Sequence, residues 1–176
     1  MHPPGPRGHN PNSLGCRKDG ALVSERAYPR RRLPVAQDPL FVYGTLRFGA
    51  VLAELIGRVP DMEPARLLGR RAAALPGRSY PGLVTATNRV TEGFLLTGLT
   101  DAEWRVLDAF EDDEYDLVPV AVTAGERAGY AWTYAWTAAA EDRDWSATAF
   151  ERDQLPRYAG KCAAWRRDLV LLSETL

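Results

Sequence analysis

From about residue 40 onward, the chain alternates between short apolar stretches and glycine or proline. Residues 41–43 (Phe-Val-Tyr) are apolar and stop at Gly44, a pattern typical of a strand entering a tight turn, because glycine permits a close backbone approach. In residues 50–56 the apolar positions recur at the spacing of one helix face. Gly57 follows directly and predicts the end of this short helix.

Strand-like patterns dominate the middle of the chain. They occupy residues 62–75 (strand-like or irregular), a turn leading into a strand at 80–84, and further strands at 91–99, 115–122 and 130–136. Gly93 indicates a bulge or a close approach, and Gly125 with Gly129 indicates a hairpin connection. Because no long helices separate these strands, an antiparallel or mixed sheet is favoured over a doubly wound one.

A helix is predicted to begin after Thr100. Thr100 and Glu103 have the spacing of a capping box, in which each side chain bonds the backbone N–H of the other residue. Trp104, Leu107 and Glu111 then recur at steps of three and four residues, so they share one helix face. We therefore expect Glu111, at the helix end, to face the protein and not the solvent.

The later part of the chain supplies aromatic and helical segments. Tyr130, Trp132, Tyr134 and Trp136 alternate with smaller residues, so one face of this strand is aromatic. Such a face is more often core than the lining of a pocket. Residues 145–158 and 163–172 have helix-like patterns, and we expect them to cover the sheet or its open end.

Residues 1–38 differ in composition from the rest. They are rich in Pro, Gly, Arg, Asn and Ser without periodicity, which predicts a disordered tail before one domain at 39–176. No secretory leader pattern follows the start and no long apolar run occurs, so a cytoplasmic protein without a membrane partner is expected.

Composition narrows the chemistry. The formal net charge of −1 argues against a nucleic-acid partner. Cys16 and Cys162 are too few for a disulfide framework or a zinc site, and both histidines, His2 and His9, lie in the tail. Acid–base chemistry must then use carboxylates, tyrosines or lysines. The acidic run at 111–114 is mostly interpreted as a solvated turn, since adjacent carboxylates do not converge into a metal site without special turns.

Three motifs occur in a recognisable order. They are Phe-Val-Tyr-Gly-Thr-Leu-Arg at 41–47, Tyr-Pro-Gly-Leu-Val at 80–84, and Leu-Thr-Asp-Ala-Glu-Trp at 99–104 continued by Leu-Asp-Ala-Phe-Glu-Asp-Asp-Glu-Tyr at 107–115. Together they resemble the gamma-glutamylcyclotransferase-like superfamily, and its AIG2-like branch most closely. The similarity extends over about residues 40–165.

The resemblance implies an α+β fold, a small mixed β-barrel with flanking helices. It also implies that Glu111 is the proton acceptor in a reaction that releases 5-oxoproline from a γ-glutamyl amine or peptide, with no cofactor and no metal. The substrate contacts that it implies come from Tyr43, Gly44, Thr45, Leu46, Arg47, Phe48 and Tyr115.

That reaction suits the residues present. Nucleophile and electrophile belong to one substrate, so the protein mainly has to hold a ring-closing pose. A carboxylate must take the proton of the α-ammonium group and pass it to the departing amine, and Glu111 on an otherwise apolar helix face fits that task.

Two departures and one alternative accompany this hypothesis. Leu117 stands where members of the superfamily commonly carry Arg, and Pro119 interrupts a predicted strand. The alternative is a binding or interaction protein that keeps the barrel and the ligand pocket without catalysis, with Glu111 as an ordinary helix-end carboxylate. The two hypotheses differ in whether Glu111 shares a cavity with the Gly44 loop.

Overall fold

A computed structural model describes residues 39–174 of the chain. The tail predicted for residues 1–38, with both histidines and Cys16, lies outside the described residues. The five strands are β1 (Leu40–Val42), β2 (Asp61–Ala73), β3 (Gly82–Thr97), β4 (Tyr115–Ala124) and β5 (Arg127–Trp136). The helices are a 3₁₀ turn η1 (Thr45–Arg47), α1 (Gly49–Ile56), α2 (Asp101–Phe110), α3 (Ala147–Asp153) and α4 (Leu155–Glu174).

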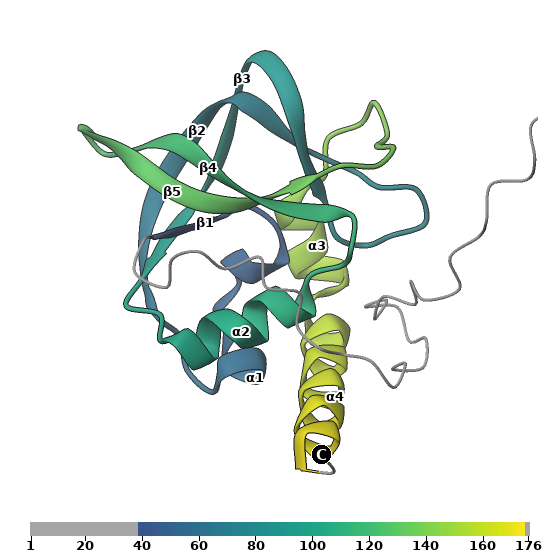
Figure 1. Cartoon of the computed structure of the whole chain (residues 1–176). Helices are drawn as coiled ribbons and strands as arrows, with labels where there is room; N and C mark the ends of the chain where they lie inside the picture. The colour runs from purple at the N-terminus through teal and green to yellow at the C-terminus, as the bar shows by residue number, and fades with distance from the viewer. Residues whose placement is uncertain (1–38, 175–176) are drawn as a thin grey trace, which may run out of the picture.

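The strands close into a barrel in the order β1-β3-β2-β4-β5. Neighbours pair antiparallel except β1 and β5, which run parallel where Leu40 lies opposite Trp132. Figure 1 shows α1, α2 and α4 gathered at one end of this barrel, with α3 beside it. The expectation of a small mixed barrel with flanking helices is therefore confirmed.

The hairpin of β2 and β3 is longer than its sequence pattern predicts. The expected separate strands at 80–84 and 91–99 belong to one strand, β3. β3 pairs with β2 both before and after a register shift at residues 68–70 of β2, where Gly69 has a φ of 79°. Val90 and Thr85 pair with Leu68 and Arg70 at the two ends of the intervening segment, whereas residues 86–89 have no paired residue in β2.

Local signals at the helix ends are confirmed. The helix α1 ends at Gly57, whose φ of 77° is left-handed. At the start of α2, Glu103 N donates to Thr100 Oγ1 at 3.2 Å and Thr100 N donates to Glu103 Oε2 at 2.8 Å, so the capping box forms in full.

The aromatic face of β5 is only partly core. Gly125, with a φ of 58°, lies in the tight turn between β4 and β5, whereas Gly129 lies within β5. Tyr134 and Trp136 are buried, but Tyr130 is 78% exposed. Figure 1 explains the difference, because the tip of this hairpin lies away from α1, α2 and α4.

Pro119 does not interrupt β4. It pairs opposite Trp132 of β5, while the other edge of β4 meets β2 at Arg66 opposite Thr123. Proline has no backbone N–H to donate, and this is tolerated where the edge of the strand that the N–H would face has no paired strand. The strand β4 therefore continues through Pro119.

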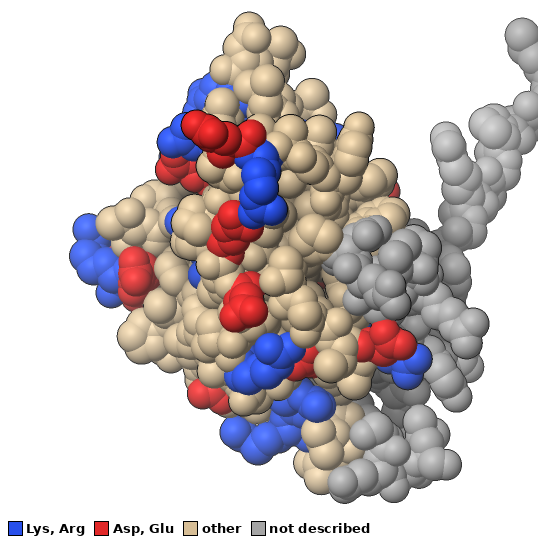
Figure 2. All heavy atoms as spheres, turned by 90° about the vertical axis from the view of Figure 1, so that its left-hand side faces the viewer, with Lys and Arg blue, Asp and Glu red and all other residues tan. Residues whose placement is uncertain are grey.

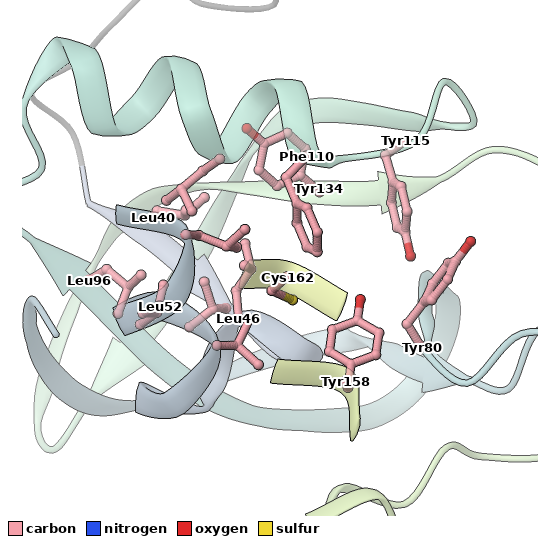
Figure 3. Packing of buried hydrophobic residues seen from close by; sticks show 14 of the residues in the cluster. Leu40, Leu46, Leu52, Tyr80, Leu96, Phe110, Tyr115, Tyr134, Tyr158 and Cys162 are labelled. Atoms are coloured by element: carbon pink, nitrogen blue, oxygen red, sulfur yellow. The ribbon is translucent and has the colours of Figure 1, made fainter. Parts of the chain in front are cut away.

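The core has two parts. One cluster contains strand residues, including Phe41, Leu67 and Leu83, together with Tyr43 of the loop after β1, and it fills the barrel. The second joins barrel residues to the helices, and Figure 3 shows part of it. In that cluster the rings of Phe110 and Trp165 meet edge to face with 5.1 Å between their centroids, so α4 contacts α2.

The surface mixes both signs of charge. On the face in Figure 2, Lys and Arg side chains are interspersed with Asp and Glu. Among the residues that the structure describes, no helix has both the length and the apolar character needed to cross a membrane.

Candidate functional site

A pocket opens where the end of β1 meets the loop before β3 and the end of α2. Its cavity volume is only about 20 Å³. The pocket is therefore narrow. Its lining residues are Phe41, Val42, Tyr43, Gly44, Thr45, Leu46, Tyr80, Pro81, Glu111, Tyr115 and Tyr134.

The loop after β1 forms one wall through its backbone. Arg47 N donates to Gly44 O at 3.1 Å, which closes the 3₁₀ turn. Arg47 N is the first donor of this turn, so the N–H groups of residues 44–46 make no hydrogen bond within the turn itself. A Cβ atom at Gly44 would lie 2.9 Å from Pro81 Cγ, which is why this wall needs glycine. Successive N–H groups of this kind suit a carboxylate.

Glu111 reaches the same pocket from α2. Trp104 and Leu107 are buried on the face predicted for them, and the helix ends at Phe110. Glu111 follows as the C-cap with extended backbone (φ −77°, ψ 138°), and its half-buried side chain lines the pocket. The acid and the Gly44 loop therefore share one cavity.

Two tyrosine hydroxyls face this acid. Tyr43 Oη donates to Tyr134 O at 2.7 Å and accepts from Leu83 N at 3.1 Å. Tyr115 Oη donates to Pro81 O at 2.5 Å. Burial, with the negative charge of Glu111 as a further cause, raises the pKa of both phenols well above the ordinary value of 10.0. Both hydroxyls consequently stay neutral.

Sequence reasoning missed several pocket residues. Tyr80 and Pro81 belong to a quoted motif without an assigned site role, and Tyr134 was assigned to the aromatic face. Tyr158 of α4 had no sequence signal, yet Thr45 Oγ1 donates to its hydroxyl at 3.4 Å. Figure 3 shows the hydroxyls of Tyr158 and Tyr115 pointing toward one another.

Arg47 and Phe48 do not line this pocket, although both were expected to contact substrate. The guanidinium group of Arg47 lies 5.4 Å from the ring of Phe94, and Phe48 stacks on Phe150 at 5.4 Å. The 3₁₀ turn directs both side chains away, because successive residues of a tight helical turn point in different directions. Leu117 is half-buried on β4, opposite Tyr134, and is also outside the lining.

The interpretation of the acidic run as a solvated turn is wrong for Asp112. This carboxylate is 4% exposed and accepts hydrogen bonds from Tyr80 Oη and, at 2.8 Å, from Arg78 Nη1. Arg78 Nη2 also donates to Glu114 Oε1 at 2.9 Å. A buried carboxylate needs such partners, and they come from a loop that lies some thirty residues earlier in the chain.

Metal-ligating side chains do not cluster in this part of the chain. Within residues 39–174, no group of three or more His, Cys, Asp or Glu residues is arranged to hold a metal ion.

Comparisons with known proteins agree with this architecture. The model of the family described as gamma-glutamyl cyclotransferase, AIG2-like, matches residues 40–151. AIG2-like protein C of Arabidopsis thaliana is 40% identical over 99 residues, which is 55% of this chain and 58% of that relative. The matched part thus spans little more than half the length of this curated relative.

Solved structures show the same fold. A solution structure of an Arabidopsis thaliana protein is 25% identical with a TM-score of 0.56 over 80% of this chain and 95% of its own. A gamma-glutamyl cyclotransferase structure superposes with a TM-score of 0.52 at 15% identity, covering 72% of this chain and 86% of that one, and this likeness concerns the fold alone. Since the family model covers well over half of the sequence, the chain belongs to the gamma-glutamyl cyclotransferase, AIG2-like family.

Proposed function

We propose that this protein is a gamma-glutamylcyclotransferase that releases 5-oxoproline from a γ-glutamyl amine or peptide, with Glu111 as the general acid and base. The observation that carries the proposal is the position of Glu111, which lines one pocket together with the loop of Tyr43, Gly44, Thr45 and Leu46. A carboxylate and a set of backbone donors in one cavity are what an intramolecular ring closure needs from a protein.

The loop is suited to the α-carboxylate of the glutamyl group. The N–H groups of residues 44–46 are not used by the 3₁₀ turn, and Gly44 lets the chain pass close to Pro81. A carboxylate bound there is held by backbone dipoles and needs no arginine in the pocket. This agrees with the position of Arg47 outside the lining.

The tyrosines are suited to the α-ammonium group. Tyr43 and Tyr115 direct their protons to the carbonyl oxygens of Tyr134 and Pro81. Their own oxygens can therefore offer lone pairs toward the pocket. An ammonium group, which has three donors, fits between such oxygens and the carboxylate of Glu111.

The chemistry then proceeds by proton transfer and ring closure. Glu111 removes a proton from the α-ammonium group, and the amine nitrogen attacks the γ-carbonyl carbon to form the five-membered lactam. After the attack the ring nitrogen still carries two hydrogens, and it gives one of them to Glu111 as the bond from that carbon to the leaving nitrogen breaks. Glu111 passes both protons in turn to the departing amine, which leaves as an ammonium ion, so atoms and charges balance without a further reactant.

The narrowness of the pocket supports a small acyl group. Its cavity volume is only about 20 Å³, so a glutamyl group must displace side chains to enter. The leaving group then extends outward from the pocket.

The test is release of 5-oxoproline from a panel of γ-glutamyl amino acids, γ-glutamyl amines and glutathione. We expect turnover by the wild type and a loss of at least about 100-fold in Glu111→Gln. Asp116→Asn, which changes an exposed carboxylate five residues further on, is the matched control and should keep the activity.

Two outcomes would contradict the proposal. Equal activity of wild type and Glu111→Gln would remove Glu111 from the mechanism. Binding of γ-glutamyl compounds without turnover, measured by calorimetry, would instead favour a ligand-binding protein on the same barrel.

A further inference from the structure

Two loops that contribute residues to the pocket lining are joined by a cluster of polar side chains. One loop precedes β3 and supplies Arg78, Tyr80 and Pro81, and the other follows α2 and supplies Glu111 and Asp112. The cluster lies beside the proposed proton acceptor and outside the chemistry described above.

The contacts within this cluster are direct. Arg78 Nη1 donates to Asp112 Oδ2 at 2.8 Å and to Tyr80 Oη at 2.7 Å, and Tyr80 Oη donates to Asp112 Oδ2. The guanidinium group of Arg78 also lies 5.0 Å from the ring of Trp136. Tyr80 and Asp112 are 1% and 4% exposed, so these bonds are shielded from water.

The cluster limits the positions open to Glu111. Asp112 is the next residue in the chain, and Oδ2 of its buried carboxylate accepts hydrogen bonds from both Arg78 and Tyr80. Pro81, which follows Tyr80, accepts from Tyr115 Oη at 2.5 Å and touches Gly44 closely enough to exclude a Cβ atom. The same contacts therefore set the spacing between Glu111 and the Gly44 loop.

Charge gives Arg78 a second role. Asp112 places a second carboxylate beside Glu111, and a nearby like charge favours the protonated form of a carboxylic acid. Burial is the largest cause of the raised pKa of Tyr158, and the negative charges of Glu111 and Asp112 are among the further causes. The two carboxylates therefore act on one common phenol. Arg78, which lies against Asp112, supplies the compensating positive charge.

Other titratable groups also surround Glu111. Tyr43, which follows β1, Tyr115 of β4 and Tyr158 of α4 lie near it, and all three are neutral phenols because their pKa values are raised. Asp108 of α2 accepts from Tyr134 Oη at 3.0 Å, and Glu114 is paired with Arg78 at 2.9 Å. Asp113 lies on the same loop. Arg78 is thus a cation that pairs with this acidic segment.

We propose that Arg78, Asp112 and Tyr80 are positioning residues that hold Glu111 at the pocket, and that Arg78 cancels the second negative charge beside it. This inference rests on the proposed function for its catalytic meaning. Its physical content, the effect of Arg78 and Asp112 on the ionisation of Glu111, is measurable without any substrate.

The experiment is a carboxyl NMR titration of protein labelled with carbon-13 at the glutamate side-chain carboxyl. The signal of Glu111 is assigned by its loss in Glu111→Gln. In Arg78→Met the titration midpoint of Glu111 should move to higher pH by about one unit, because Asp112 is left uncompensated. In Asp112→Asn it should move to lower pH, because the neighbouring negative charge is removed while the positive charge of Arg78 remains.

Two further variants complete the comparison. The double variant Arg78→Met with Asp112→Asn removes both charges and should return the midpoint close to that of the wild type. It also leaves no unpaired buried charge, so it folds even where Arg78→Met alone does not. Arg58→Met breaks a comparable pair, with Glu103, away from the pocket and should leave Glu111 unchanged.

The outcomes separate this inference from the proposed function. An unchanged midpoint in Asp112→Asn and in whichever Arg78 variant folds would overturn the inference. Midpoints that move as stated while the wild type releases no 5-oxoproline would uphold the charge relation and refute the cyclotransferase. Where the wild type is active, the acidic limb of its rate profile should move with the midpoint, and kcat should change more than KM.

Discussion

A single methyl group at Gly93 would collide with β1. A Cβ atom there would lie 2.3 Å from Val42 O and 2.8 Å from the ring of Phe41, closer than real contacts allow. Because backbone and a buried ring stand in the way, we expect Gly93→Ala to lower the free energy of unfolding by about 3 kcal/mol in urea titrations. The Gly44 loop begins directly after these β1 residues, so the pocket should be disturbed as well.

Gly160 offers the matched control. It is exposed in α4, and nothing lies within 4 Å of an added Cβ atom. Gly160→Ala should stabilise the protein by up to about 1 kcal/mol, since alanine is the better helix former. Equal stability of wild type and Gly93→Ala would show that β1 can shift, and that the close approach is not a packing constraint.

Among the elements, α2 depends most visibly on charge. Arg58 donates to Glu103 through Nε at 2.5 Å and through Nη2 at 2.7 Å. This bond, and the backbone N–H of Thr100, lower the pKa of Glu103 from 4.5 to about 2. Since the folded pKa lies below the ordinary value, the stabilisation is complete above pH 4.5 and is lost as the pH falls toward 2.

The size of this contribution is limited by solvent, because Arg58 is 43% exposed. The wild type should lose stability between about pH 5 and about pH 2.5, and we expect this loss to be smaller by about 1 kcal/mol in Glu103→Gln. Glutamine keeps the capping hydrogen bond, so the change isolates the charge. Thermal unfolding at both pH values is the measurement, with Glu126→Gln in the exposed β4–β5 turn as control. An unaltered pH dependence in Glu103→Gln would assign acid sensitivity to other carboxylates.

At the scale of the whole molecule, α4 joins the helices to the barrel. Cys162 of α4 is 1% exposed and lies within the cluster that includes Leu46 and Phe110 (Figure 3). A thiol in this position reacts only when the packing opens. Its reactivity therefore reports whether α4 separates from the domain on its own.

We expect α4 to unfold together with the barrel. In a Cys16→Ser variant, labelling of Cys162 by a disulfide reagent should be slow and should accelerate with urea in parallel with global unfolding. Labelling that is fast and independent of urea would mean that α4 opens locally. In that case the contact between Thr45 and Tyr158 would be intermittent.

Signals that act over a few residues determined much of the fold. The capping box of Thr100 and Glu103, the end of α1 at Gly57 and the apolar face of α2 each depend on neighbours within one helical turn. Such patterns are complete in the sequence, so they predicted the elements correctly. The order of the three motifs along the chain likewise indicated the family, because residues that share a binding loop or a helix end keep their sequence spacing.

Contacts between distant segments were decided only by the tertiary structure. The parallel pairing of β1 with β5, the course of β3 across its register shift and the burial of Asp112 all depend on partners far away in the chain. The lining of the pocket by Tyr80 and Tyr134 has the same origin. A sequence lists which groups are present, but closure of the barrel selects which of them meet, because packing and desolvation act on neighbours in space.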